Sequence, residues 1–325
     1  MRELWRMKKI LLYVSFFLIL VGVRARLVAS EEAMSLSQET ALVAGSIETA
    51  DMRDQILAHI EAYEMDPVEP RHDPVWEFVP GLHGLEFDFE LSYQNMLANG
   101  DFDASLMVVR SIPYSGDSET FRQHRIYKGN ENSTYVALLI NVAWGGDELS
   151  EMLDILDEHD VQASIFFEGK FAENNRELVL EVFNRGHLVG NHSYSHPADW
   201  LELSYAGFEE EIVKTNEILT NVTGEQVVYF APPGGAFVDE TIQAAYDQGM
   251  YTILWSADSI DWRGEPANVL VSRVMRRIRP GGLILTHPKP ETVIALPEII
   301  ERIRDEGYEF RSVDEIVNGI RVMND

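Results

Sequence analysis

The chain has 325 residues, of which 46% are hydrophobic and 25% are charged, and it contains no cysteine. This composition is typical of a packed globular protein, and the lack of cysteine excludes disulfides, thiolate metal sites and cysteine nucleophiles. The 54 acidic residues outnumber the 26 basic ones, which gives a formal net charge of −28. Such a charge excludes a general binder of nucleic-acid phosphates, because that class needs surplus lysine and arginine.

Residues 1–30 have the pattern of a targeting segment. Basic residues between Arg2 and Lys9 precede an uncharged run over Ile10–Val23. This run is shorter than the about 20 residues of a membrane-spanning helix and suits the apolar part of a signal peptide. Small residues at positions 28–30 favour cleavage, whereas arginines at 24 and 26 keep an uncleaved membrane anchor open. The sequence therefore predicts an extracytoplasmic protein, secreted or anchored, with membrane contact only through this segment.

The next hundred residues predict a spacer and a small module. Residues 31–80 favour a helical spacer followed by a linker with four prolines. A small N-terminal α/β module is expected over residues 81–130. Within it, Leu85–Leu91 alternates between apolar and polar residues and predicts a strand. A helix over Tyr93–Ala98 should end at Asn99-Gly100, and Ser105–Arg110 is expected to be a second strand.

Residues 131–325 show a regular alternation of short apolar strands and helices. The expected strands are Tyr135–Asn141, Gln162–Phe167, His187–Asn191, Val227–Phe230, Tyr251–Trp255, Gly282–Thr286 and Tyr308–Arg311. The expected helices are Leu149–His159, Arg176–Arg185, Tyr205–Leu219, Asp239–Gln248, Pro266–Ile278 and Leu296–Glu306. This alternation predicts a small α/β barrel with a parallel sheet inside and helices outside. Chemistry in such barrels gathers at the carboxyl ends of the strands.

Polar residues follow several of these strands. His192 and His196 are four residues apart after the third strand; in a helical turn they would face the same way and reach one metal ion. Two unrelated surface histidines are the simpler alternative. A third histidine, His287, closes the sixth strand, and Asp258–Trp262 and Phe230–Gly235 follow the fifth and fourth. Four strand ends that carry such residues favour a shared site.

These motifs resemble those of a known family. His192-x-x-x-His196, Pro232-Pro233-Gly234, Asp261-Trp262 and Leu285-Thr286-His287 are similar in order and spacing to the polysaccharide deacetylases with a NodB homology domain. The segments Trp76–Arg110 and Ile140–Gly145 resemble the sporulation-associated branch. The resemblance implies a distorted (β/α)7-type barrel, a divalent metal, commonly Zn²⁺, and a bacterial cell-wall setting. It also implies hydrolysis of a carbon–nitrogen, non-peptide bond in N-acetylated glycans, either peptidoglycan or chitin-like.

The resemblance also implies roles for individual residues. His192 and His196 would be metal ligands, with His287 the general acid and Asp261 its partner. Trp262 and Leu285 would form the walls of the acetyl pocket. Pro233, Gly234 and Tyr194 would complete the substrate site, with a backbone N–H near Gly234 available to an oxyanion.

Three positions depart from the family pattern. Asn141 stands where the catalytic base Asp is expected, Val142 where the metal-binding Asp is expected, and Ala231 where an Arg is expected. Asparagine accepts no proton at neutral pH and valine offers no donor atom to a metal. Loss of a positioned general base costs about 10²–10⁴-fold in rate. An arginine without its carboxylates would be an unpaired buried charge, so alanine is the consistent residue at 231.

Three hypotheses follow from these departures. The first is a deacetylase with impaired catalysis, in which a rearranged metal site or Asp147 or Glu148 substitutes for the missing groups. The second is a catalytically silent pseudoenzyme of the cell envelope or spore wall. It would bind glycan in a groove lined by four aromatic residues: Trp144, Tyr194, Trp200 and Trp262. The third is another reaction class, for which the sequence offers no supporting residues. The sequence favours the first hypothesis for the chemistry, with the second as its alternative.

Overall fold

The computed structural model describes residues 51–116 and 121–321. Within these ranges the chain forms two units, one from residues 51–64 and 87–109 and the other from residues 65–86 and 110–321. The predicted targeting segment and the first part of the predicted spacer lie outside the described residues. No helix in the described ranges combines the length and the apolar character needed to cross a bilayer.

The smaller unit differs from its sequence prediction in one instructive way. Leu85–Leu91 was expected to be a single strand. Instead, strand β3 (Gly84–Phe87) ends at Phe87, and helix α2 (Phe89–Asn99) begins two residues later. The Asp88 carboxylate accepts a hydrogen bond from the Leu91 N–H, so an N-cap overrides the alternating pattern. Gly100, with φ of 87°, ends the helix as expected.

The rest of this region is short. Residues 51–59 are helical and continue into a 3-10 turn at Ile60–Ala62. Of the expected second strand, Ser105 and Leu106 lie instead in a further 3-10 turn, Ala104–Leu106, where the Asp103 side chain accepts from the Ser105 N–H, while Val109 and Arg110 are in a strand as predicted. Strand β4 (Val109–Ile112) then pairs with β3. Met52, Ile56, Phe87 and Met96 form the small unit's buried core.

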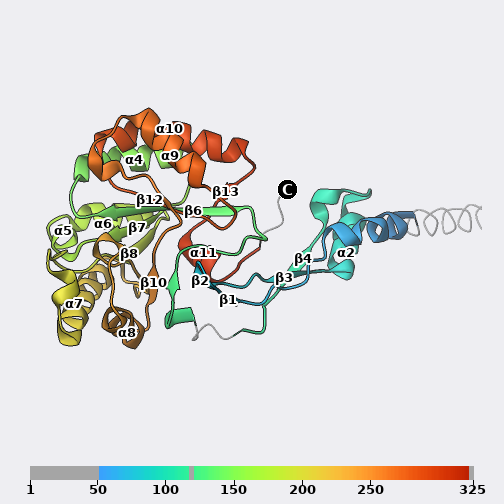
Figure 1. Ribbon diagram of the computed structural model, residues 1–325. Helices are drawn as coiled ribbons and strands as arrows, with labels where there is room; N and C mark the ends of the chain where they lie inside the picture. Colours follow the sequence, from blue (N-terminus) through green and yellow to red (C-terminus); the bar gives the residue numbers. More distant parts are fainter. Residues whose placement is uncertain (1–50, 117–120, 322–325) are drawn as a thin grey trace, which may run out of the picture. The chain divides into compact units, whose positions relative to one another are not determined.

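The larger unit contains a long curled sheet (Figure 1). Its described strands are β1 (Arg71–Asp73), β2 (Glu77–Val79), β5 (Arg125–Ile126), β6 (Tyr135–Val142), β7 (Ser164–Phe167), β8 (Leu188–Asn191), β9 (Tyr229–Phe230), β10 (Tyr251–Ile253), β11 (Ala257–Asp258), β12 (Leu283–Thr286) and β13 (Glu309–Phe310). They are ordered β1-β2-β5-β10-β9-β8-β7-β6-β12-β11, with β13 also paired to β6. Every pair from β5 to β11 is parallel, whereas β1, β2 and β5 pair antiparallel.

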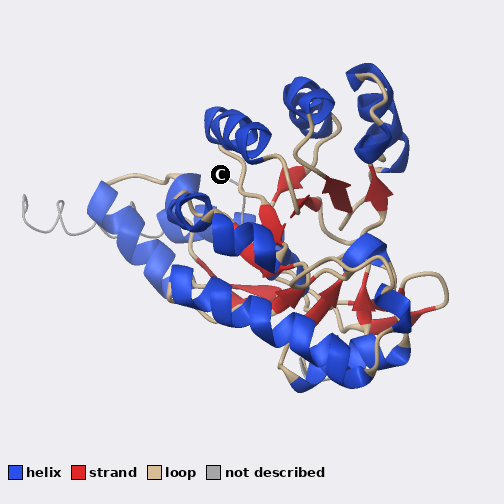
Figure 2. Cartoon of the chain, turned by 90° about the vertical axis from the view of Figure 1, so that its left-hand side faces the viewer, coloured by secondary structure: helices blue, strands red, loops and turns tan. Residues whose placement is uncertain are grey.

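Helices cover the outer face of this sheet (Figure 2). They are α4 (Gly146–Glu158), α5 (Gly169–Asn174), α6 (Arg176–Asn184), α7 (Tyr205–Thr223), α8 (Asp239–Asp247), α9 (Ala267–Arg277) and α10 (Pro290–Asp305), whereas α11 (Val313–Val317) packs with the core inside the curl. The six predicted helices are all present, and α10 starts six residues earlier than expected because Pro290 opens its first turn. The predicted distorted (β/α) barrel is therefore confirmed as a curled mixed sheet that stays open as a half-barrel.

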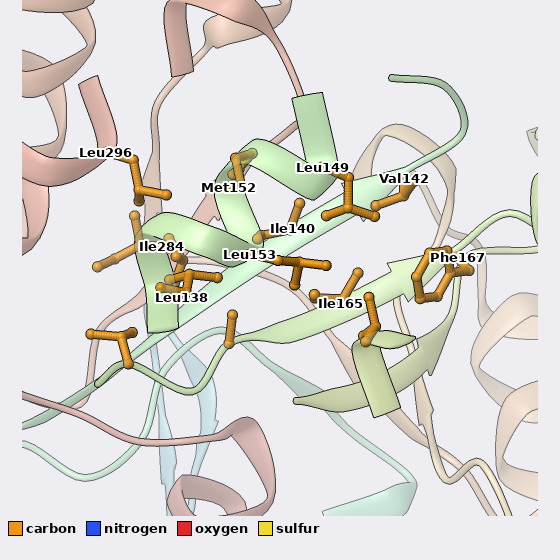
Figure 3. Close-up of a cluster of buried hydrophobic side chains, with 14 of the residues drawn as sticks. Leu138, Ile140, Val142, Leu149, Met152, Leu153, Ile165, Phe167, Ile284 and Leu296 are labelled. Atoms are coloured by element: carbon orange, nitrogen blue, oxygen red, sulfur yellow. The ribbon is translucent and has the colours of Figure 1, made fainter. Parts of the chain in front are cut away.

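Strand β6 separates two hydrophobic cores. Its residues alternate: Val136, Leu138, Ile140 and Val142 pack with the helices on the outer face. Tyr135, Ala137 and Leu139 pack inside the curl with residues of β7, β9, β10 and β12. Figure 3 shows the outer core, with Val142 beside Leu149 of α4. Because side chains alternate along a strand, Asn141 falls on the inner face.

Candidate functional site

The carboxyl ends of the parallel strands meet around one pocket of about 300 Å³. Asn141 comes from the end of β6, His192 and His196 follow β8, Asp258 ends β11, and His287 follows β12. The walls are apolar and are formed by Trp144, Trp255, Trp262 and Leu285, with Gly234 at one side. The structure therefore brings together most of the residues that the sequence analysis selected.

The two histidines lie side by side, but not on a helix. Their ring centroids are 5.1 Å apart with the rings at 60°. Residues 192–197 form an irregular loop, called here the histidine loop, so the expectation of a helical turn is wrong. Ser193 and His196 have φ of 64° and 44°, values that L residues rarely adopt. The loop still brings the two imidazole rings together, as a helical turn would.

Glu211 of α7 holds this loop in place. Its carboxylate accepts hydrogen bonds from the Tyr194 and Ser195 N–H groups at 2.9 and 2.8 Å, and from the Ser195 hydroxyl at 2.7 Å. Ser193 Oγ also accepts from the His196 N–H at 3.1 Å. The sequence analysis did not select Glu211, because nothing in a helix pattern shows which surface-spaced glutamate turns toward a loop.

The environment of His192 keeps its ring neutral. Its Nδ1 lies 2.7 Å from the Ala231 carbonyl oxygen, which can only accept, so the proton is on Nδ1 and Nε2 is the free acceptor. Burial, followed by the neighbouring His196, lowers the pKa of His192 to about 3. Burial also lowers the pKa of His196. Neutral imidazoles are the form that a metal or a hydrogen-bond donor requires.

Asp261 and His287 form a buried pair. The His287 Nδ1 lies 2.7 Å from one Asp261 oxygen, while the His287 N–H donates to the other at 2.7 Å. The Thr292 hydroxyl donates to the same carboxylate at 2.8 Å. Burial by itself would raise the pKa of Asp261, but these hydrogen bonds outweigh it and the pKa lies below its ordinary value. The carboxylate is therefore ionised and orients the ring. Thr292 is another contributor that the sequence analysis missed.

Two of the three positions that depart from the family pattern, Asn141 and Val142, lie on opposite faces of β6. Asn141 is 3% exposed, lines the pocket, and its Oδ1 has no hydrogen-bond partner. Val142 is completely buried in the outer core and does not line the pocket. Strand β6 runs one residue beyond the predicted end, with Val142 paired to Phe167, so the alternation of the strand directs this side chain to the helices.

Other predicted residues are divided between the pocket and its surroundings. Trp262, Leu285 and Gly234 line the pocket as expected. Pro233 is buried behind the lining, and Tyr194 lies elsewhere, with its hydroxyl on Glu173 and Lys214 over its ring. Trp200, expected in the groove, is a core residue whose indole N–H donates to the Ala236 carbonyl. Trp255 takes its place as a wall, which the sequence analysis did not anticipate.

The side chains present do not complete a catalytic metal site. His192 and His196 supply two adjacent imidazoles, but a catalytic zinc commonly takes three protein ligands. Across residues 51–116 and 121–321, no cluster of three or more His, Cys, Asp or Glu side chains is arranged to hold an ion. Val142, at the position where the family's metal-binding Asp is expected, has no donor atom and points into the core.

Comparison with known proteins identifies the family of this fold and pocket. Residues 128–253 match the family named Polysaccharide deacetylase. Uncharacterized protein YlxY of Bacillus subtilis is 37% identical over 270 residues, which cover 83% of this chain and 84% of YlxY. The chain belongs to the polysaccharide deacetylase family. The peptidoglycan-N-acetylglucosamine deacetylase of Bacillus cereus is 28% identical, over 72% of this chain and 92% of that enzyme.

Solved structures also resemble this chain. BA3943, a pseudoenzyme of the CE4 family from Bacillus anthracis, superposes with a TM-score of 0.75 and 36% identity, over 83% of this chain and 96% of that protein. A mutant of BA3943 with restored enzymatic activity superposes equally well, with a TM-score of 0.75 and 35% identity over 83% and 99% of the two chains. Enzymes of this family are metal-dependent, and family members act on peptidoglycan and chitooligosaccharides.

Proposed function

We propose that this protein is a catalytically silent member of the family that binds cell-wall glycan without hydrolysing it. The observation that carries the proposal is the composition of the pocket. Its three indole walls and the Asp261–His287 pair are present, whereas no carboxylate stands at either of the family's base and metal-ligand positions. The similarity to BA3943, itself a pseudoenzyme, supports the same conclusion.

The composition of the pocket favours binding of a sugar ring over catalysis. Trp144 and Trp262 are 41% and 53% exposed, which is unusual for indoles that only pack a core, and both line the pocket. Trp144 stacks on His287 with ring planes 9° apart, which holds the indole in one orientation. Apolar walls with a few fixed polar groups are the usual design of a small-ligand site.

The proposed partner is a peptidoglycan or chitin-like strand containing N-acetylated sugars, because relatives of this chain act on such glycans. The proposed location is the bacterial cell envelope or spore wall, with residues 1–30 directing export. The glycan-binding domain would then be the unit formed by residues 65–86 and 110–321, because strands from the expected linker and small module belong to its sheet.

Two measurements on the purified protein test this proposal. Calorimetric titration with chitotetraose or a peptidoglycan fragment should show binding that Trp262→Ala weakens by about tenfold or more. Acetate release from the same oligosaccharides, with added Zn²⁺, should stay at background, and Asn141→Asp should stay there too because it returns only the base. Efficient acetate release by the wild type would instead support the impaired-deacetylase hypothesis, and absence of glycan binding would refute the proposal.

A further inference from the structure

Resting on the proposed glycan-binding function, we infer that the pocket holds the protonated amine of a de-N-acetylated sugar unit rather than an acetamide. The protein would then be a reader of glycan that active relatives have already deacetylated. Three features of the pocket support this assignment: its hydrogen-bond acceptors, its charge and its aromatic walls.

One histidine nitrogen in the pocket is an acceptor by its hydrogen-bond geometry. His192 donates from Nδ1 to the Ala231 carbonyl and leaves Nε2 with a lone pair. His287 donates from Nδ1 to Asp261, whose ionised carboxylate places a negative charge beside this ring. An ammonium group brings three N–H donors and no acceptor, so it suits this arrangement.

Asn141 adds a further acceptor that the protein does not use. Its Oδ1 has no hydrogen-bond partner although the residue is almost fully buried at the wall of the pocket. A buried polar atom without a partner is uncommon in folded proteins. Because the terminal amide torsion of asparagine is broad, the oxygen turns toward a donor at little cost. An ammonium N–H in the pocket would supply that donor.

An acetamide lacks a comparable set of partners. Its carbonyl oxygen needs a metal or a strong donor, and its single N–H uses only one of the available acceptors. The described residues form no complete metal site, so no bound metal is available to polarise an acetyl oxygen. The pocket therefore lacks the group that binds the acetyl oxygen in the family's chemistry.

The charge of the pocket also favours a cation. Asp258 contributes a carboxylate to the lining, and the buried Asp261 lies behind His287, whereas no lysine or arginine is part of the lining. Two cations pack on indoles of the pocket walls: Lys289 lies over the Trp144 ring and Arg263 over the Trp262 ring. Each is therefore directed at an indole. The net charge of −28 further attracts a polycationic strand.

The aromatic walls of the pocket also suit an ammonium group. Indole rings attract ammonium groups, and aromatic cages are a common way to recognise them. Trp255 and Trp262 line the same pocket as Asp258. Carboxylate, imidazoles and indoles thus surround a volume of about 300 Å³, which is large enough for one sugar unit.

Paired titrations of the whole protein test this inference. At a pH of about 6, where a sugar amine is protonated, fully deacetylated chitosan tetramer should bind at least about tenfold tighter than chitotetraose. Asp258→Asn should remove most of that preference, because the substitution removes the carboxylate charge from the lining while an amide oxygen can still accept the Ile260 N–H. Glu217→Gln, which removes the same charge from an exposed position on α7, should leave the preference intact.

The possible outcomes separate the two proposals. If neither oligosaccharide binds, the glycan-binding function itself is wrong. If chitotetraose binds as tightly as the chitosan tetramer or more tightly, only the inference about the amine is overturned. A preference for the chitosan tetramer that survives in Asp258→Asn, or that disappears equally in Glu217→Gln, reflects the overall charge of the protein and also overturns the inference.

Discussion

Val142→Asp returns the family's metal-binding aspartate in sequence, yet we expect it to destabilise the fold. The Val142 side chain is completely buried among apolar residues between β6 and the helices. Removing its two methyl groups costs about 2 kcal/mol, from about 0.8 kcal/mol for each buried carbon plus a cavity contribution. A neutral carboxyl group buried without a partner adds about 1–3 kcal/mol. The free energy of unfolding should therefore fall by about 3–5 kcal/mol even before ionisation is considered.

Ionisation makes this penalty depend on pH. Burial raises the pKa of such a carboxyl by up to about 3–5 units, whereas the unfolded chain keeps a value near 3.9. Between those two values the folded variant binds one proton more than the unfolded chain, so its stability falls as the pH rises. The slope is about 1.36 kcal/mol per pH unit. From pH 5.5 to 7.5 the variant should lose up to about 2.7 kcal/mol more than the wild type.

Urea denaturation of wild type, Val142→Asp and Val142→Ala at both pH values measures these quantities. Val142→Ala is the matched control, because it removes the methyl groups without adding a carboxyl and should show no extra dependence on pH. The reasoning fails if Val142→Asp is as stable as Val142→Ala at pH 7.5. That result would mean that the side chain at position 142 reaches the pocket or solvent instead of the core.

Three further predictions concern the site. Asp261→Asn should lower the free energy of unfolding by about 1.5–3 kcal/mol at neutral pH, because it removes charge-assisted hydrogen bonds. Since the pKa of Asp261 lies below its ordinary value, thermal melts should show this difference narrowing as the pH falls below about 4 through the folded-state pKa. Metal analysis of protein purified without added zinc should find well below one Zn²⁺ per chain; a full equivalent that the double variant His192→Ala, His196→Ala loses would restore the metal-centre hypothesis. Glu211→Ala should weaken glycan binding by about tenfold in calorimetric titrations, because it removes the acceptor for three hydrogen bonds of the histidine loop; unchanged affinity would show that the loop keeps its shape without Glu211.

The alternation of strands and helices, and the strand ends that carry His192 and His287, were predictable from the sequence alone, whereas Asp261 follows β11, which was not among the predicted strands. The physical reason is that short apolar runs between amphipathic helices form a parallel sheet, and parallel strands present their carboxyl ends at one edge. The predicted strand positions placed each polar residue at that edge, and β6, β8 and β12 do end beside the pocket. The departures Asn141, Val142 and Ala231 were also visible without coordinates, since each follows from residue type at a motif position.

The direction of individual side chains was decided only by tertiary structure. The pairing of Val142 with Phe167 extends β6 by one residue, and strand alternation then separates Val142 from Asn141 across the sheet. The histidine loop takes its shape from Glu211 on α7. Trp200, expected in the groove, lies in the core, and Trp255 lines the pocket, because burial of an indole depends on neighbours far away in sequence. Each of these outcomes rests on a contact between residues that local sequence patterns do not pair.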